Sequence, residues 1–183
     1  MWQRYWDDRG REFLMLAVAQ DVEGGVRVRP VVRERGVEFP VLIDRTSALG
    51  KALGFGIVPT GFFVDADGAI RYRHTNDFDV SDPRVRRNLE HFLAGEEVEQ
   101  LDDEERMSPE ALDLFAEGVA LHLRERKEEA VALWRRALEL DPDNFVIRSQ
   151  IWVAVHPERF YPAVDREWQE LQLAKEGYDK PLP

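Results

Sequence analysis

The segment VPTGFFVDADGAIRYRH, residues 58–74, constrains the fold more than any other part of the chain. Two runs rich in aromatic and β-branched residues flank Asp67-Gly68. An Asp-Gly pair favours a tight turn between antiparallel strands, because glycine adopts positive φ without a steric penalty. We therefore expect a hairpin with strands at Gly61–Asp65 and Ala69–His74, entered directly after Pro59.

The residues before this hairpin alternate between strand and helix patterns. Phe13–Ala19 is a continuous apolar run, which predicts a strand buried on both faces of a parallel sheet. Phe39–Asp44 predicts a second strand, and Pro40 favours an edge position for it. A helix is expected between the two strands, at about Val28–Arg35, with Pro30 in its first turn. A second, short helix is expected between the second strand and the hairpin, capped by Thr46 or Ser47 and ended by Gly54.

A well-punctuated helix follows the hairpin. Asp82 is expected to cap it, Pro83 to occupy its first turn and Gly95 to end it. Seven acidic residues then fall within residues 96–105, EEVEQLDDEE. Such a run is typical of a solvated linker. It divides the chain into a domain at residues 1–103 and a second domain at residues 104–183.

The stretches FLMLAVAQD, FPVLID and VPTGFFVDADGAIRY resemble the redoxin branch of the thioredoxin superfamily, which includes TlpA-type thiol-disulfide reductases and peroxiredoxins. The resemblance covers residues 11–95. It implies that Pro59 is a cis-proline with Val58 and Thr60 beside it. It also implies that the backbone before Pro59 faces the substrate and pairs with an extended peptide.

The same family carries a strand and a Cys-x-x-Cys motif before the part that this chain matches, and MWQRYWDDRG resembles only the tail of the catalytic helix. The sequence contains no cysteine. We therefore predict no catalytic residues, no metal site and no cofactor, and read the chain as a non-enzyme as it stands.

The missing strand would be central in the family's sheet, between the strands at Phe13–Ala19 and Gly61–Asp65. Its absence leaves two strand edges with unpaired backbone groups. Either these strands pair directly, or a second copy, a partner's strand or an upstream segment fills the position. We expect association, as a homodimer.

The region after the acidic run resembles a tetratricopeptide repeat followed by a diverged helical pair. Ser108 and Pro109 open a first helix, which continues to Leu123, and a second helix spans about Glu128–Leu140. Gly118, Ala130 and Ala137 fall at repeat positions where small residues let the paired helices approach closely. Residues 145–155 and 162–177 give two further helical patterns. The predicted fold class is thus α/β, an incomplete thioredoxin-like sheet followed by a small all-α tetratricopeptide-like domain.

The loop HPERFYPAVDREWQ gathers polar and aromatic side chains between two helices. A ligand or interaction site uses such a mixture. The alternative is a packed inter-helix loop in which aromatic rings close one end of the helical domain. The candidate residues are His156, Arg159, Tyr161 and Trp168.

Charge and hydropathy limit the function classes. Lys and Arg number 25 against 36 Asp and Glu, a net charge of −11, with no basic stripe. This balance argues against binding nucleic acid or an anionic membrane. No apolar run approaches the length of a membrane span, and the first ten residues do not resemble a signal peptide. As written the chain reads as cytoplasmic, or as extracytoplasmic if a longer exported parent exists.

These observations favour a non-catalytic interaction or scaffold protein with a protein or peptide partner. Two alternatives stay open. The chain is the C-terminal portion of a thiol-disulfide oxidoreductase or peroxiredoxin whose cysteines lie upstream of Met1, or it is a small-ligand-binding module that uses the position beside Pro59 or the His156 loop.

Overall fold

The computed structural model describes residues 1–75, 77–100, 108–161 and 163–178. The chain forms two compact units. The first, called the strand unit here, comprises Met1–Asp44 and Ile57–Glu104, and the second, called the helical unit, comprises Arg45–Gly56 and Glu105–Pro183. The chain thus leaves the strand unit after β2 and returns to it just before Pro59. The predicted domain boundary at residue 103 lies outside the described residues.

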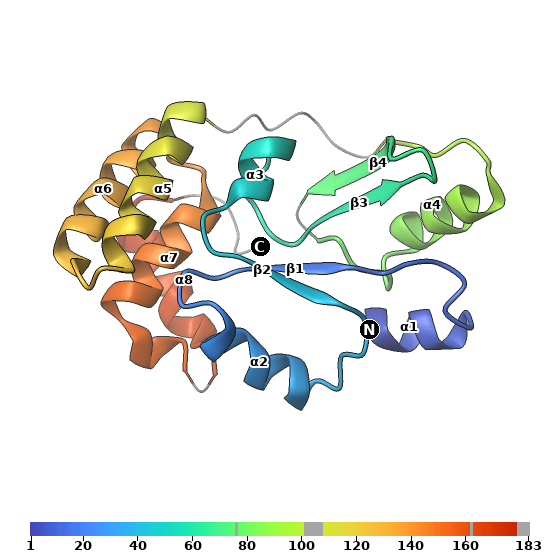
Figure 1. The fold of residues 1–183 in the computed structure, drawn as a ribbon, viewed down its shortest axis with the longest axis horizontal. Coiled ribbons are helices and arrows are strands. Elements are labelled where there is room, and N and C mark those ends of the chain that lie inside the picture. Colours follow the sequence, from blue (N-terminus) through green and yellow to red (C-terminus); the bar gives the residue numbers. More distant parts are fainter. Residues whose placement is uncertain (76, 101–107, 162, 179–183) are drawn as a thin grey trace. The chain divides into compact units, whose positions relative to one another are not determined.

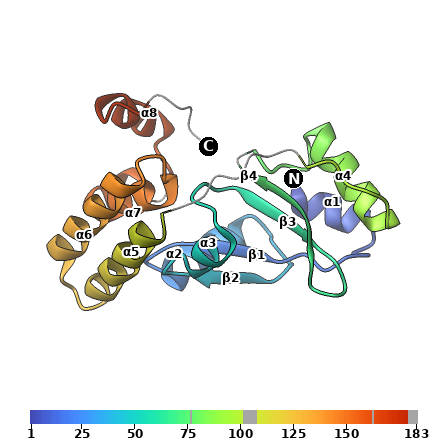
Figure 2. The ribbon, with the colours of Figure 1, turned by 90° about the horizontal axis from the view of Figure 1, so that it is seen from above.

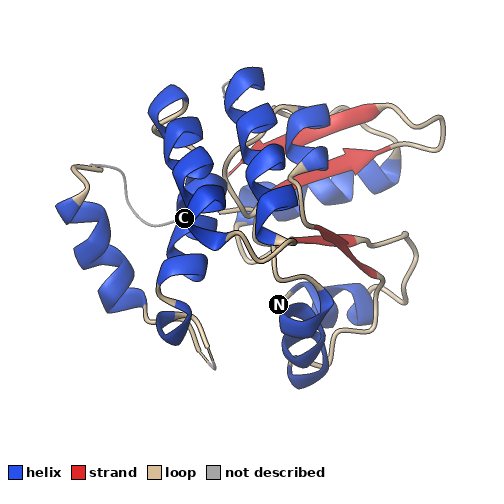
Figure 3. Cartoon of the chain, turned by 60° about the vertical axis from the view of Figure 1, so that its left-hand side comes forward, coloured by secondary structure: helices blue, strands red, loops and turns tan. Residues whose placement is uncertain are grey.

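The strand unit holds two separate pairs of strands. Its elements are α1 (Trp2–Asp8), β1 (Ala17–Gln20), α2 (Gly25–Glu34), β2 (Val41–Asp44), β3 (Thr60–Val64), β4 (Ile70–Thr75) and α4 (Pro83–Ala94) (Figure 1). β1 pairs with β2 in parallel, and β3 pairs with β4 antiparallel. Within the described residues each pair is a two-stranded sheet of its own (Figure 3). The fold is therefore mixed α/β with small sheets, as predicted.

The first strand is shorter and more exposed than its apolar sequence predicted. β1 begins at Ala17, four residues after Phe13, and all its residues are half-buried. The Ala17 N–H donates to the Pro40 carbonyl, which is the first hydrogen bond between β1 and β2. Pro40 has no N–H with which to form the preceding hydrogen bond, so the pairing does not extend further toward the N-terminus. Leu14, in the apolar run before β1, is 86% exposed. The prediction of a strand from Phe13 buried on both faces was wrong.

The helix after β1 also differs from its prediction. α2 begins at Gly25, three residues before the expected start, so Pro30 lies inside the helix and not in its first turn. An internal proline removes one helical hydrogen bond. No residue of α2 is buried, and Val26 is 79% exposed. This helix therefore receives little stabilisation from packing within the unit.

The hairpin and the last helix of the strand unit follow their sequence signals. The Asp65 N–H donates to the Ala69 carbonyl at 2.9 Å across the turn, and Gly68 has φ +82°. The Asp82 carboxylate accepts from the Arg84 N–H at 2.7 Å, and Pro83 begins α4. Gly95 ends α4 with φ +74°. Local residue chemistry therefore predicted both elements.

The core of the strand unit lies between the β3–β4 pair, α4 and α1. The Phe63 and Tyr72 rings stack with centroids 4.5 Å apart and pack with Leu89. Partly buried residues of α1 and of the segment after β4 surround this cluster, among them Trp2 and Phe78.

The helical unit is built from α3 (Ala48–Leu53), α5 (Pro109–His122), α6 (Lys127–Leu140), α7 (Phe145–Val155), the short 3-10 helix η1 (Pro157–Arg159) and α8 (Arg166–Lys175). α5, α6 and α7 pack side by side in sequence order (Figure 2). The expected helices of this region are therefore present. None of the described helices is long and apolar enough to cross a membrane.

Candidate functional site

The inner edges of β1 and β3 form the candidate site, which we call the strand gap. Successive residues of a parallel strand direct their backbone groups to opposite edges. The Ala17 N–H donates to the Pro40 carbonyl at 3.0 Å, on the β2 side. Val18 therefore directs its N–H and C=O to the other edge of β1, where the sheet has no further strand among the described residues.

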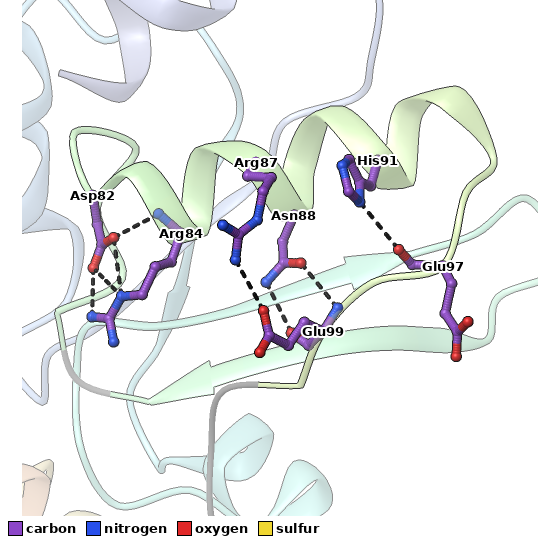
Figure 4. A network of polar contacts seen from close by, with 7 residues as sticks. All are labelled: Asp82, Arg84, Arg87, Asn88, His91, Glu97 and Glu99. Carbon is purple, nitrogen blue, oxygen red and sulfur yellow. Dashed lines mark hydrogen bonds and ion pairs between the residues drawn. The ribbon is translucent and has the colours of Figure 1, made fainter.

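The outer edge of the hairpin, in contrast, is covered. The Gln100 side chain donates to the Arg71 carbonyl at 2.5 Å and accepts from the Arg73 N–H at 3.3 Å, so its amide satisfies backbone groups of β4. The segment that carries Gln100 is held by Asn88 of α4, whose side-chain amide exchanges two hydrogen bonds with the Glu99 backbone, at 2.8 and 2.9 Å (Figure 4). The chain thus covers the β4 edge of this sheet, and on the β3 edge the described residues add no further strand.

Helix α1 connects the two strand pairs. On one side the Trp2 indole N–H donates to the Phe78 carbonyl at 3.2 Å, beside β4. On the other side the Trp6 indole N–H donates to the Phe13 carbonyl at 2.8 Å, and its ring meets Phe39 edge-on at 5.9 Å, just before β2. α1 therefore contacts both pairs, which no strand of the described residues joins.

The strands that border the gap are uncharged and largely apolar. β1 reads AVAQ and β3 reads TGFFV. Leu16, directly before β1, and Leu42, in β2, are half or more exposed. Edge strands of monomeric proteins commonly carry charges or proline that block further pairing, and these two strands carry neither.

The predicted substrate-facing residues lie at the entry to β3. The Val58–Pro59 peptide bond is cis, as the resemblance implied. Pro59 is exposed, and the Thr60 hydroxyl donates to the Ile57 carbonyl at 2.6 Å. The structure therefore brings Val58, Pro59 and Thr60 to one end of the strand gap.

Two of the other candidate residues, His156 and Trp168, belong to a cluster of rings in the helical unit. The Trp168 ring lies 5.1 Å from that of His156, 5.7 Å from Trp152 and 6.1 Å from Phe160. His156 also lies 3.5 Å from the Glu158 carboxylate. This arrangement packs the loop between α7 and α8 against both helices.

Arg159 and Tyr161 take part in that loop separately from the rings. Arg159 pairs with Asp165 at 3.0 Å, and Asp165 caps α8 through the Trp168 N–H. This N–H, followed by the Arg159 guanidinium, holds the pKa of the Asp165 carboxyl below its usual value. The Tyr161 N–H donates to the Pro157 carbonyl at 3.1 Å. The rings of His156 and Trp168 are thus in contact, whereas Arg159 pairs with the carboxylate that caps α8.

Two features of the site were not found from the sequence. The sequence indicated the first helix only as the tail of a helix and did not predict the contacts that Trp2 and Trp6 make. The Gln100 side chain that covers β4 lies in an acidic run, which predicted only a solvated linker.

Comparison with known proteins supports the thioredoxin-like interpretation of the strand unit. Residues 3–89 match the family model described as Redoxin. Among solved structures, the crystal structure of a hypothetical protein from Sinorhizobium meliloti 1021 matches with 20% identity and a TM-score of 0.45, over 58% of this chain and 69% of that chain. No curated protein matches the chain. Residues 3–89 are therefore similar to a redoxin, thioredoxin-like domain.

Proposed function

We propose that the redoxin domain is a non-catalytic interaction module that completes its sheet with a strand from another polypeptide, the partner being a second copy of this chain. One observation carries the proposal. A single compact unit contains two two-stranded sheets whose inner edges, on β1 and β3, have no strand between them in the described residues.

The energetics favour adding a strand at this position. Backbone N–H and C=O groups are strong hydrogen-bonding groups, and an open strand edge is a template for pairing with another chain. β1 and β3 run in opposite directions (Figure 1), so a strand between them is parallel to one and antiparallel to the other. Strands of four and five residues on either side suit an incoming strand of about the same length.

A second copy is a suitable partner because the edges bear no charge. Each chain has a net charge of −11, which disfavours association between most of its surfaces. The strands beside the gap contain no charged residue, and exposed apolar side chains such as Leu16 adjoin them. Pairing there hides apolar surface from water without bringing acidic groups together.

Val58, Pro59 and Thr60 would then contact the incoming strand at the end of the gap where β3 begins. Mixed main-chain and side-chain contacts of this kind are typical of strand addition, in which the backbone supplies affinity and neighbouring side chains supply specificity. On this proposal these three residues bind a partner and take no part in bond-breaking chemistry.

The oligomeric state of two variants at position 18 tests the proposal. Val18→Pro removes the N–H that faces the gap and leaves the β1–β2 hydrogen bonds in place, whereas Val18→Thr keeps both the N–H and the branched shape. Sedimentation velocity at several concentrations should show dimers for the wild type and Val18→Thr, and monomers for Val18→Pro. Circular dichroism checks that all three are folded. A wild type that stays monomeric, or a folded Val18→Pro chain that dimerises equally well, contradicts the proposal.

A thiol-disulfide oxidoreductase or peroxiredoxin is the second candidate function, favoured by the Redoxin match at residues 3–89. It requires cysteines outside the 183 residues, which contain none. The intact mass of the endogenous protein distinguishes the interaction module from the oxidoreductase. A mass near 21.3 kDa supports the interaction module, and a mass several kilodaltons higher, with reactive thiols, supports the reductase.

We also propose that the helical unit is built on one tetratricopeptide-like repeat. The close approach of α5 to α6 supports this. Gly118 lies against Trp134, so that a Cβ added to Gly118 would be 2.3 Å from the indole nitrogen. The Trp134 N–H donates to the Phe115 carbonyl at 3.0 Å across the same contact. A small residue at that repeat position permits this packing.

A further inference from the structure

Residues 14–18, LMLAV, which we call the leucine segment, lead from the apolar run before β1 into the strand itself. The pairing of β1 with β2 begins at Ala17, so among the described residues no strand pairs with residues 14–16. These three residues are neither helix nor turn, and the chain before β1 runs on in the direction of the strand (Figure 1). The leucine segment therefore extends β1 beyond the end of its sheet.

Large apolar side chains in and beside the leucine segment are exposed to solvent. Leu14 is 86% exposed and Leu16 is 50% exposed, and Leu42 of β2 is 54% exposed. Val18 pairs with Leu42 in the parallel register, so these two side chains lie on one face of the β1–β2 sheet. Because side chains alternate along a strand, Leu16 and Leu14 continue the same face toward the N-terminus. We call it the leucine face.

Helix α2 covers the opposite face of the β1–β2 sheet. Ile43 follows Leu42 in β2, so its side chain points away from the leucine face. A Cβ at Gly25 of α2 would lie 3.5 Å from the Ile43 Cδ1. The leucine face is thus the one that α2 does not cover. Contiguous exposed apolar patches of this kind mark interaction sites.

The backbone of the leucine segment can pair with a further strand. Val18 directs its N–H and C=O to the edge of β1 that faces away from β2. By the same alternation, the backbone groups of Leu16 and Leu14 face that edge. A strand added there gains main-chain hydrogen bonds and buries apolar side chains at the same time.

The charges on either side of the leucine segment favour pairing with a second copy of itself. Arg11 lies five residues before Leu16, and Asp21 lies five residues after it. Arg9 lies seven residues before Leu16, and Glu23 lies seven residues after it. An antiparallel pair centred on Leu16 therefore brings the basic flank of one copy near the acidic flank of the other. The Arg11 side chain is 48% exposed beside its own ion-pair partners, so it can also meet this flank.

We propose that the leucine segments of two copies pair as antiparallel strands around a two-fold axis at Leu16, so that this segment is the strand that β1 receives from its partner. The inference rests on the proposed function for the nature of the partner, and it identifies the part of the partner that binds. The contact is self-complementary, as a two-fold interface requires.

This pairing defines which residues meet. Leu16 lies opposite the partner's Leu16, and Leu14 lies opposite the partner's Val18. Each of these pairs exchanges main-chain hydrogen bonds and places two apolar side chains next to each other on the leucine face. The two-stranded β1–β2 sheets of the two copies then join into one larger sheet. A larger sheet is more stable, because an isolated pair of strands is only marginally stable.

Single cysteines test the contact, because the chain has none of its own. Leu16→Cys should form an intermolecular disulfide under mild oxidation, since the two Cα atoms would be about 5.5 Å apart, within disulfide range. Val31→Cys is the matched control, because Val31 is 51% exposed but lies on α2. Leu16→Cys should crosslink at least about tenfold faster than Val31→Cys, because pairing raises the effective concentration of its thiols. Non-reducing gel electrophoresis measures both rates.

A mixture of two variants tests the register. Leu14→Cys and Val18→Cys chains of different mass should together form the mixed disulfide. Leu14→Cys alone should crosslink slowly, because the two copies of residue 14 would be about 14 Å apart. Mass spectrometry distinguishes the mixed dimer from the two homodimers, and circular dichroism checks that each variant is folded.

The outcomes distinguish this inference from the proposed function. A wild type that sediments as a dimer, with Leu16→Cys and Val31→Cys crosslinking at equal rates, overturns the pairing of the leucine segments but leaves the interaction module standing. A dimer in which Leu14→Cys crosslinks with itself as fast as with Val18→Cys overturns the register. A wild type that stays monomeric contradicts both the inference and the proposed function.

Discussion

The Trp2 and Phe78 side chains form a stacked pair, with ring centroids 4.8 Å apart and planes inclined by 20°. The Trp2 indole N–H also donates to the Phe78 carbonyl at 3.2 Å. Because Trp2 belongs to α1 and Phe78 follows β4, this pair attaches the helix to the β3–β4 sheet. It also keeps the Phe78 ring directly over Gly61 of β3.

Substituting Gly61 with alanine should disturb this pair. The new Cβ would lie 2.1 Å from Phe78 Cε1, so the ring must move away from Trp2. Overpacking of this kind costs about 1–3 kcal/mol. Urea unfolding of the full chain measures the loss. In a Phe78→Ala background the same substitution should cost much less, because the obstructing ring is absent. An equal cost in both backgrounds contradicts the packing described here.

Gly118→Ala provides the corresponding prediction for the helical unit. Helix propensity alone favours alanine by about 1 kcal/mol. The Cβ, however, would lie 2.3 Å from the Trp134 indole nitrogen, and this ring is fully buried and hydrogen-bonded to Phe115. We expect a net destabilisation of about 1–3 kcal/mol in thermal and urea unfolding. Glu117→Ala, at the neighbouring exposed position, should change stability little. A stabilised Gly118→Ala chain would show that α5 and α6 do not approach so closely.

Asp82 gives a prediction about acid stability. Hydrogen bonds from the Arg84 side chain, and then from its backbone N–H, lower the pKa of the Asp82 carboxyl from 3.8 to about 2 (Figure 4). A pKa lowered by folding means that this carboxylate stabilises the folded chain fully above the unfolded-state pKa. The contribution is lost as the pH falls from about 4 toward 2.

Asp82→Asn keeps an oxygen acceptor for the helix cap but has no carboxylate. The stability difference between wild type and Asp82→Asn should therefore be constant above about pH 5 and shrink between pH 4 and pH 2. Urea unfolding at pH 6, 4, 3 and 2 measures it. Arg84→Ala should flatten this pH dependence, because it removes the main cause of the shift. A difference that does not change with pH would show that the pKa is not lowered.

Local chemistry made part of this structure predictable. Asp82, Pro83 and Gly95 define α4 because capping, fixed φ and positive φ act within a few residues. The hairpin turn at Gly68 depends on the same short-range effects. The match of residues 3–89 to the Redoxin family likewise agrees with motifs visible in the sequence.

Features that depend on distant contacts were not predictable. β1 begins late because Pro40, more than twenty residues away in sequence, limits its ladder. The position of residues 45–56 depends on Asp113 and Val146, far along the chain. At the candidate site, the sequence indicated the open edges and the position of Pro59, but not that helix α1 contacts both strand pairs.

The exchange rates of two neighbouring amides test the central claim most directly. Ala19 and Val18 lie in the same strand, but the Ala19 N–H faces β2 and the Val18 N–H faces the strand gap. NMR-detected hydrogen exchange resolves the two amides. If another strand pairs with β1, both amides are protected at high protein concentration, and Val18 loses its protection on dilution while Ala19 keeps it. A Val18 amide that exchanges at the rate of an unstructured chain at every concentration, beside a protected Ala19, would contradict strand addition.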